Sequence, residues 1–146
     1  MIAVKIEKRK EFMQAFLSAD RFDELYVMNA EIRTLITTKI NGLIQNGWLS
    51  EEEKKELDDA EFAKWKQIRP IVYDLVKGKK IPSAVIVNLM KIFENGDKGI
   101  LRVQYINGEL EVITAYQTVE FTLNKEAEFE WDEYCAKWLS AFDNGA

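Results

Sequence analysis

Histidine does not occur in the 146 residues of this sequence, and cysteine occurs only at Cys135. Histidine is the usual general base near neutral pH and the commonest metal ligand. Its absence excludes a Ser-His-Asp triad, a Cys-His pair and the ordinary structural zinc site. An enzyme built on this sequence would have to use carboxylates, Lys or Tyr, and we predict no metal and no cofactor. The single cysteine also excludes an internal disulfide framework, which predicts a reducing compartment.

Long hydrophobic runs are missing as well. The longest run, 81–90, is interrupted by Pro82, Ser83 and Asn88, whereas a membrane-spanning helix needs about 20 apolar residues. The N-terminal stretch 1–6 is short and is followed at once by charged residues, unlike a signal peptide. We therefore predict a cytoplasmic protein without a membrane partner.

The residues that are present are typical of one folded domain. The chain has 47% hydrophobic, 31% charged and 12% aromatic residues, and disordered chains lack such an apolar fraction. A chain of this length buries on the order of 70% of its unfolded surface, which is enough for a core without disulfides or metals. We expect residues 1–146 to form a single domain.

Hydrophobic periodicity predicts the order of helices and strands. Helical patterns extend over 8–19, 50–69, 70–77 and 126–142. Strand patterns extend over 2–6, 24–41, 43–45, 83–93, 100–106, 109–115 and 118–123. The strands cluster instead of alternating singly with helices. The predicted fold class is therefore α+β, with a mainly antiparallel sheet of five to seven strands and three or four helices packed on it.

Two Asn-Gly pairs predict hairpin turns, because both central residues of a type I′ turn need a positive φ. Asn107 and Gly108 lie between two alternating segments and give the clearest local signal in the chain. Asn41 and Gly42 follow another alternating segment, so we expect a second hairpin there, with a short return strand at 43–45.

Capping signals and proline set the expected helix boundaries. Ser50 and Glu53 fit a capping box at the start of the helix 50–69. Pro70 disfavours helical backbone in the preceding residue, so we expect a break there and a second helix that ends at Gly78. Near the end of the chain, we expect Val119, Phe121 and Leu123 of the strand 118–123 to point inward.

The tryptophans and the cysteine are assigned mainly to the core. Trp65, Trp131 and Trp138 lie on apolar helical faces, whereas Trp48 stands beside a glycine before a helix and is the best candidate for exposure. Cys135 lies on the apolar stripe of the last helix. We interpret it as a small packed hydrophobe in preference to a reactive thiol.

Charge is unevenly spread along the chain. The net charge is −5, which argues against general affinity for nucleic acid or anionic membranes. Residues 51–61 contain seven acids and two lysines, whereas residues 64–80 contain six bases and one acid. The dense acidic spots, such as Asp58 and Asp59, are interpreted as a solvated face, because neighbouring positions on a helix point apart.

The basic segment is the candidate site. It contains Arg69, Lys77, Lys79 and Lys80 around the expected end of a helix. Lysines there are ordinary partners of the helix dipole and could also pair with Asp74. Alternatively they form a surface that binds an anion or the carboxylates of a partner.

Several functions stay open on this basis. Our leading hypothesis is a non-enzymatic binding or adaptor module with a basic surface around 69–80, whose partner is an acidic protein or a small anionic ligand. The alternative is a protein that binds a small molecule or anion, or a carboxylate-based hydrolase. The third hypothesis is a weak nucleic-acid binder in which Trp65 stacks on bases. Homo-oligomerisation is also open.

Short motifs along most of the chain carry a resemblance to a known family. They are Met1-Ile2-Ala3, Ser50-Glu51-Glu52-Glu53, Trp65, Ile68-Arg69-Pro70, Lys77-Gly78-Lys79, Pro82, Phe121-Thr122-Leu123 and Trp131-Asp132-Glu133. In these motifs the chain resembles an uncharacterised bacterial family, a domain of unknown function found in small stand-alone cytoplasmic proteins. The family pattern has a longer segment after the strand near Pro82. The resemblance implies no catalytic residue.

Overall fold

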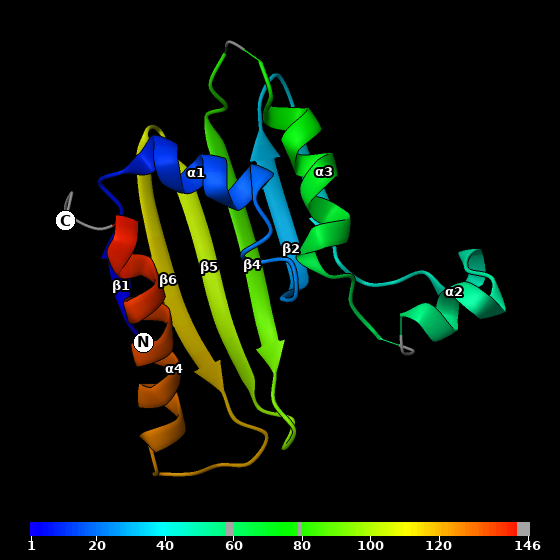
Figure 1. Cartoon of the computed structure of the whole chain (residues 1–146), viewed down its shortest axis with the longest axis vertical. Coiled ribbons are helices and arrows are strands. Elements are labelled where there is room, and N and C mark those ends of the chain that lie inside the picture. The colour runs from blue at the N-terminus through cyan, green and yellow to red at the C-terminus, as the bar shows by residue number, and fades with distance from the viewer. Residues whose placement is uncertain (58–59, 79, 143–146) are drawn as a thin grey trace.

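A six-stranded antiparallel sheet with order β1-β6-β5-β4-β2-β3 forms the centre of the protein. The computed structural model describes residues 1–57, 60–78 and 80–142 (Figure 1). Its strands are β1 (Ala3–Lys5), β2 (Tyr26–Arg33), β3 (Thr37–Asn41), β4 (Ala84–Ile92), β5 (Lys98–Ile106) and β6 (Glu109–Gln117). Its helices are α1 (Arg9–Ser18), α2 (Glu51–Glu56), α3 (Trp65–Val76) and α4 (Glu126–Leu139), with short 3-10 turns η1 (Asn46–Trp48) and η2 (Ser140–Phe142). The predicted α+β class, antiparallel sheet and numbers of elements are confirmed.

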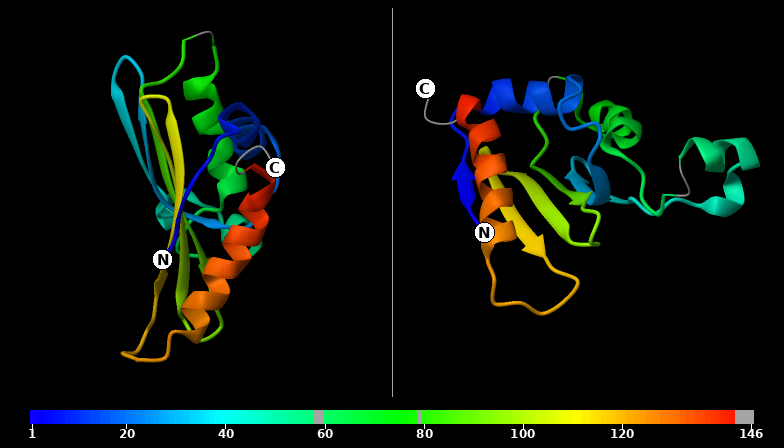
Figure 2. Two further views of the ribbon diagram at one scale, coloured as in Figure 1. Left: turned by 90° about the vertical axis from the view of Figure 1, so that its left-hand side faces the viewer. Right: turned by 60° about the horizontal axis from the view of Figure 1, so that its bottom comes forward.

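Three helices lie on the same face of the sheet. Figure 1 shows α4 along β6, α1 across one end of the sheet and α3 beside β2, and Figure 2 shows the opposite face uncovered. The core therefore lies between one face of the sheet and these helices. Within the described residues, no helix is long and apolar enough to cross a membrane.

The β5–β6 hairpin forms as predicted. Asn107 and Gly108 have φ values of 50° and 85°, and Tyr105 pairs with Leu110. Glycine is suited to the second position because it has no Cβ to clash at positive φ. The strand β4, whose side chains are apolar on both faces, occupies the middle of the sheet between β5 and β2.

Aromatic rings fill the core beneath α1. Trp65 is fully buried and stacks on Phe16 with 4.5 Å between ring centroids. Its indole Nε1 donates a hydrogen bond to the Phe16 backbone oxygen at 3.0 Å, which satisfies its polar atom inside the core. Phe12 and Phe22 complete the cluster with edge-on contacts.

The last helix packs against β5 through Trp131 and Cys135, which are buried as predicted. The indole Nε1 of Trp131 donates to the Ile100 backbone oxygen at 3.1 Å. A Cβ at Gly99 would lie 2.6 Å from the Trp131 ring, so the helix can approach the sheet closely only because residue 99 has no side chain.

The hairpin predicted at Asn41-Gly42 was wrong. The strand pattern at 24–41 is two strands, β2 and β3, joined by a turn at 34–36 that has no Gly, Pro or Asn to signal it. At Gly42 the chain leaves the sheet, since the Asn41 side chain accepts from the Leu43 amide at 2.8 Å. Glycine is needed here because a Cβ would lie 1.8 Å from the Val27 oxygen.

The long helix predicted over 50–69 was also wrong. The capping box of Ser50 and Glu53 forms, but α2 ends at Glu56, and α3 begins at Trp65 and continues through Pro70. Residues 60–64 do not continue the helix but return to the body, where the Val27 amide donates to the Ala63 oxygen at 2.8 Å. These tertiary hydrogen bonds outweigh the local helical pattern.

Residues 43–57 and 60–62 form an arm that projects from the side of the sheet (Figures 1 and 2). Its base is held by a bridge between Leu43 and Phe62 and by a hydrogen bond from the Ile44 amide to the Glu61 oxygen at 2.9 Å. The arm carries η1 and α2. Asp58 and Asp59, predicted to belong to a solvated acidic face, lie outside the described residues.

The strand predicted at 118–123 does not form. Val119, Phe121 and Leu123, expected to point inward, are exposed, and Phe121 is 91% exposed. The chain turns away after β6 because the Val119 amide donates to the Asp97 carboxylate at 3.0 Å. Tyr116 also donates to that carboxylate, at 2.8 Å. Asp97 thus fixes the β4–β5 turn to the loop that leads to α4.

Candidate functional site

A groove of about 750 Å³ opens where α3 ends, at the end of the sheet that α1 crosses. We call it the upper groove. Its lining residues come from α1 and the segment before it, the end of α3, the loop to β4 and the β5–β6 hairpin. They are Glu7, Arg9, Lys10, Glu11, Met13, Leu17, Val76, Ile81, Pro82, Val85, Tyr105 and Gly108. The volume lies in the range of ligand-binding pockets, about 300–1,000 Å³.

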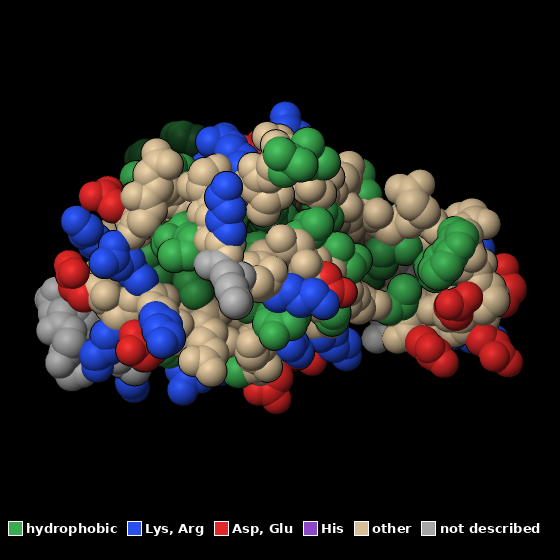
Figure 3. Space-filling view, turned by 90° about the horizontal axis from the view of Figure 1, so that it is seen from above, with side chains coloured by type: hydrophobic (Ala, Val, Ile, Leu, Met, Phe, Trp, Pro, Cys, Tyr) green, Lys and Arg blue, Asp and Glu red, His purple; other side chains and the backbone are tan. Residues whose placement is uncertain are grey.

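The upper groove combines an apolar floor with a charged rim. Met13, Leu17 and Tyr105 pack against the core and supply apolar surface to the groove. The lining contains two bases, Arg9 and Lys10, and two acids, Glu7 and Glu11. Lys77 and Lys80 stand next in sequence to the lining residues Val76 and Ile81, and Glu109 stands next to Gly108. Figure 3, which views this end of the molecule, shows Lys and Arg side chains around exposed hydrophobic side chains.

Two local features shape the walls. The Arg9 guanidinium donates a hydrogen bond to the Gly108 oxygen, so the start of α1 is attached to the tip of the β5–β6 hairpin. Opposite it, α3 stops at Val76 and Gly78 adopts a φ of 129°. A residue with a side chain rarely adopts this φ. The helix ends just before Gly78, close to the predicted end, and the chain then continues toward Pro82.

Of the predicted site residues, Arg69 lies apart from the upper groove. It makes a two-pronged ion pair with Asp23, in which both nitrogen–oxygen distances are 2.9 Å. These hydrogen bonds raise the pKa of Arg69, and only 21% of its side chain is exposed. Arg69 therefore links α3 to the loop that follows α1, and its hydrogen-bonding capacity is largely used inside the protein.

Two of the predicted lysines stand next in sequence to residues that line the groove. Lys77 follows the lining residue Val76 and contacts Asp74 at 3.2 Å, in an ion pair whose two side chains are both exposed. Such a pair is worth little in water, so Lys77 keeps its ability to bind a partner. Lys80 is exposed and precedes the lining residue Ile81. Lys79 lies outside the described residues.

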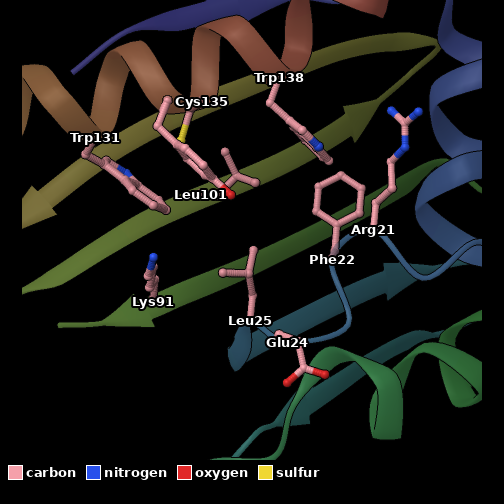
Figure 4. A pocket seen from close by; sticks show the side chains of 10 residues that line it. Arg21, Phe22, Glu24, Leu25, Lys91, Leu101, Trp131, Cys135 and Trp138 are labelled. Atoms are coloured by element: carbon pink, nitrogen blue, oxygen red, sulfur yellow. The ribbon is translucent and has the colours of Figure 1, made fainter. Parts of the chain in front are cut away.

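A second, smaller cavity of about 200 Å³ lies between α4 and the loop that follows α1. Figure 4 shows Trp131, Cys135 and Trp138 projecting from α4 toward Leu101 and Phe22. Burial raises the pKa of Cys135 to about 12, and the nearby Asp132 adds to the effect. The thiol is protonated at neutral pH and is unsuited to act as a nucleophile.

The carboxylates of the described residues form no acid–base pair in these cavities. The second cavity contains Glu24 as its one acid, whose pKa is lowered by a hydrogen bond from Lys64. In the upper groove, Glu7 and Glu11 are one helical turn apart on the surface. No cluster of three or more potential metal-binding side chains occurs in residues 1–57, 60–78 and 80–142.

The nucleic-acid hypothesis requires an exposed Trp65 ring that stacks on bases. Trp65 is instead fully buried against Phe16. Trp48, on the arm, is the tryptophan that is exposed, with 81% of its surface accessible. This matches the expectation from its glycine neighbour. Three glutamates, Glu51 to Glu53, follow it closely in the sequence, and carboxylates repel a phosphate backbone.

Sequence reasoning missed the half of the groove that α1 contributes. Arg9 and Lys10 open a helix whose apolar face was assigned to the core, and Tyr105 was assigned to a hairpin pair. Periodicity places residues on a face of their own helix, but it does not show which helix end meets which loop. The one available signal was the concentration of bases at 8–10, which recurs at 77–80.

The fold and the groove define an α+β protein with helices on one face of an antiparallel sheet, an architecture that by itself assigns no activity. A family model, described as a family of unknown function, matches residues 15–99 and 91–143. The chain belongs to this family, DUF5721. No curated protein and no solved structure matches the chain.

Proposed function

We propose that this protein is a non-enzymatic binding module that holds an acidic partner, anchored by an apolar side chain, in the upper groove. The observation that carries the proposal is the combination of a groove of about 750 Å³ with an apolar floor and two exposed lysines, Lys77 and Lys80, next in sequence to residues of its lining. A partner with carboxylates around an apolar anchor would fit both parts.

The division of roles follows from the chemistry of the lining. Burial of an aromatic or aliphatic anchor against Met13 and Tyr105 would supply affinity, since apolar burial contributes about 25 cal/mol per Å². Lys77 and Lys80 would act as point charges that attract the acidic partner and select against basic ones. Arg69 is assigned to the protein's internal structure, because its guanidinium already binds Asp23.

The proposal also includes a location for the protein in the cell. The chain contains one cysteine, and that cysteine is buried. Free buried thiols are at home in a reducing compartment. We therefore include a cytoplasmic location in the proposal.

The test is fluorescence anisotropy with short labelled peptides that carry one Trp flanked by Glu residues. We expect binding by the wild type and at least about tenfold weaker binding by Lys77→Glu/Lys80→Glu, because two attractive charges become repulsive. Lys39→Glu/Lys125→Glu changes the net charge equally at exposed positions in β3 and at the start of α4, neither of which lines the groove, and should bind like the wild type.

Three further probes separate the alternatives. A peptide with Ala in place of Trp tests the apolar anchor, polyphosphate tests a small anion, and a single-stranded oligonucleotide tests nucleic acid. Tighter binding of either polyanion than of the Trp peptide would overturn the proposal. Equal binding by the wild type and the groove variant would also overturn it.

A further inference from the structure

The tip of the arm exposes a large aromatic side chain without a packing partner. Trp48 is 81% exposed, although a tryptophan buries up to about 250 Å² when it is packed. It belongs to η1, whose backbone is closed by a hydrogen bond from the Trp48 amide to the Gln45 oxygen at 3.1 Å. Tryptophan is among the residues most often found as energetic anchors of protein interfaces.

The arm presents this anchor in a defined conformation. Ser50 and Glu53 exchange side-chain to backbone hydrogen bonds of 2.9 and 3.2 Å just after Trp48. These bonds lower the pKa of Glu53 and keep it ionised. Glu51 and Glu52 add two more exposed carboxylates. An ordered anchor loses less entropy on binding than a flexible one.

The tip of the arm and the upper groove have complementary chemistry. The tip offers one exposed indole a few residues before Glu51, Glu52 and Glu53. The groove offers an apolar floor edged by Arg9 and Lys10 together with Glu7 and Glu11, and Lys77 and Lys80 stand next in sequence to its lining. A groove of about 750 Å³ is large enough for an indole with its flanking backbone. In Figure 1 the arm leaves the body beside the start of α3, whereas α1 and the end of α3 lie at the other end of the sheet. The groove is lined from α1 and the end of α3, so a contact between arm and groove would join two molecules.

We infer that the acidic partner of the upper groove is the arm of a second copy of this protein, with Trp48 as the anchor. This inference rests on the proposed function and names its partner. Two different surfaces meet, so the contact is head-to-tail, and each molecule keeps one arm or one groove open for the next. The products are rings or chains whose length grows with concentration and shrinks with salt.

Sedimentation velocity on the full chain tests the inference. We expect the wild type to associate as its concentration rises toward about 1 mM at low ionic strength and to dissociate in about 0.5 M salt. Trp48→Ala removes the anchor, and Lys77→Glu/Lys80→Glu reverses the rim. Each variant should be monomeric by itself. Phe121→Ala, at another exposed aromatic residue, should associate like the wild type.

A mixing experiment gives the decisive outcome. The Trp48→Ala variant keeps an intact groove and the rim variant keeps an intact arm, so an equimolar mixture should form a 1:1 heterodimer and no larger species. A symmetric interface or nonspecific aggregation does not give this result. Adding Glu51→Lys and Glu52→Lys to the rim variant gives each molecule a basic arm and an acidic rim. This combined variant should regain association, because the charges of the two surfaces have been exchanged.

Failure of this inference is distinguishable from failure of the proposed function. A wild type that stays monomeric, or a mixture that gives no heterodimer, overturns the second copy as partner. If the same preparations bind Glu-flanked Trp peptides in the groove, the binding module stands and its partner is another acidic protein. Circular dichroism and thermal unfolding establish that the Trp48→Ala and rim variants are folded.

Discussion

Replacement of Arg69 by alanine tests whether this residue serves the structure or a ligand. The substitution removes both 2.9 Å hydrogen bonds to Asp23 and leaves a carboxylate that is only 13% exposed without its partner. A hydrogen bond to a charged group contributes about 1.5–3 kcal/mol. Water reaches part of this pair, so we expect the free energy of unfolding to fall by about 2 kcal/mol.

The predicted change is measurable by thermal or urea unfolding. A chain of 146 residues has an unfolding entropy of about 0.3 kcal/mol/K, so Tm should fall by about 6 °C. Lys66→Ala, at an exposed position on the same helix, is the control and should change Tm little. A double-mutant cycle that combines Arg69→Ala with Asp23→Ala should give a coupling free energy of about 1 kcal/mol or more between the two residues.

One result would refute this reasoning. If Arg69→Ala unfolds like the Lys66→Ala control but no longer binds Glu-flanked peptides, Arg69 contacts the partner and the ion pair with Asp23 is incidental. Arg69→Lys separates charge from geometry, because lysine keeps the charge and loses the two-pronged contact. A structural role predicts intermediate stability for that variant and unchanged peptide binding.

The other predictions concern three internal contacts. Gly99→Ala should lower the free energy of unfolding by about 2 kcal/mol, because its Cβ would overlap the Trp131 ring. Gly47→Ala is the control and should cost much less, because no atom lies within 4 Å of a Cβ there. Equal effects of the two substitutions in urea unfolding would contradict the close packing at Gly99. Asp97 has a lowered pKa because the neighbouring amide and hydroxyl donate to its carboxylate. Its stabilising contribution is present above its unfolded pKa of about 4 and is lost as the pH falls through the lower folded value. Asp97→Asn should therefore be less stable than the wild type at pH 7, with a difference that shrinks in acid, and a difference independent of pH would argue against this. Burial raises the pKa of Cys135 to about 12, so a thiol reagent at pH 8 should label the unfolded chain quickly and the native chain very slowly; fast native labelling would show that the cavity beside α4 opens.

The elements that were predicted correctly depend on local chemistry. Asn107-Gly108 lies between two alternating segments, and the hairpin needs no distant residue to form. The stripe of the last helix likewise identifies Trp131 and Cys135 as core, because the 3.6-residue period selects one face. Ser50 and Glu53 are three residues apart and make their hydrogen bonds to each other's backbone.

The elements that were predicted wrongly are those decided by distant partners. Residues 57–64 continue a helical pattern, yet Ala63 accepts a hydrogen bond from Val27, far away in the chain. Residues 118–123 alternate like a strand, but the Asp97 carboxylate holds Val119 and directs the chain off the sheet. No window of sequence around either segment contains these partners.

The basic site at Arg69, Lys77, Lys79 and Lys80 stays a prediction. Lys77 and Lys80 were identified from the density of basic residues, and each stands next in sequence to a residue that lines the groove. Arg69 was grouped with them by proximity in sequence. In the structure it faces Asp23, whose position depends on how the loop after α1 packs. The groove itself is a product of tertiary packing and has no local signature.

The pairing of β1 with β6 has a consequence for how the protein is made. Ala3 pairs with Ile113 and Val4 with Val112, so β1 finds its neighbour only after more than a hundred further residues have been synthesised. The β2–β3 hairpin and the β4–β5–β6 meander join strands that follow one another in the chain, and they can form earlier. During synthesis the exposed edge of β6 is thus the last to be covered, and a strand of another nascent chain can occupy it first. Slowed translation after residue 117 would give β1 time to close this edge.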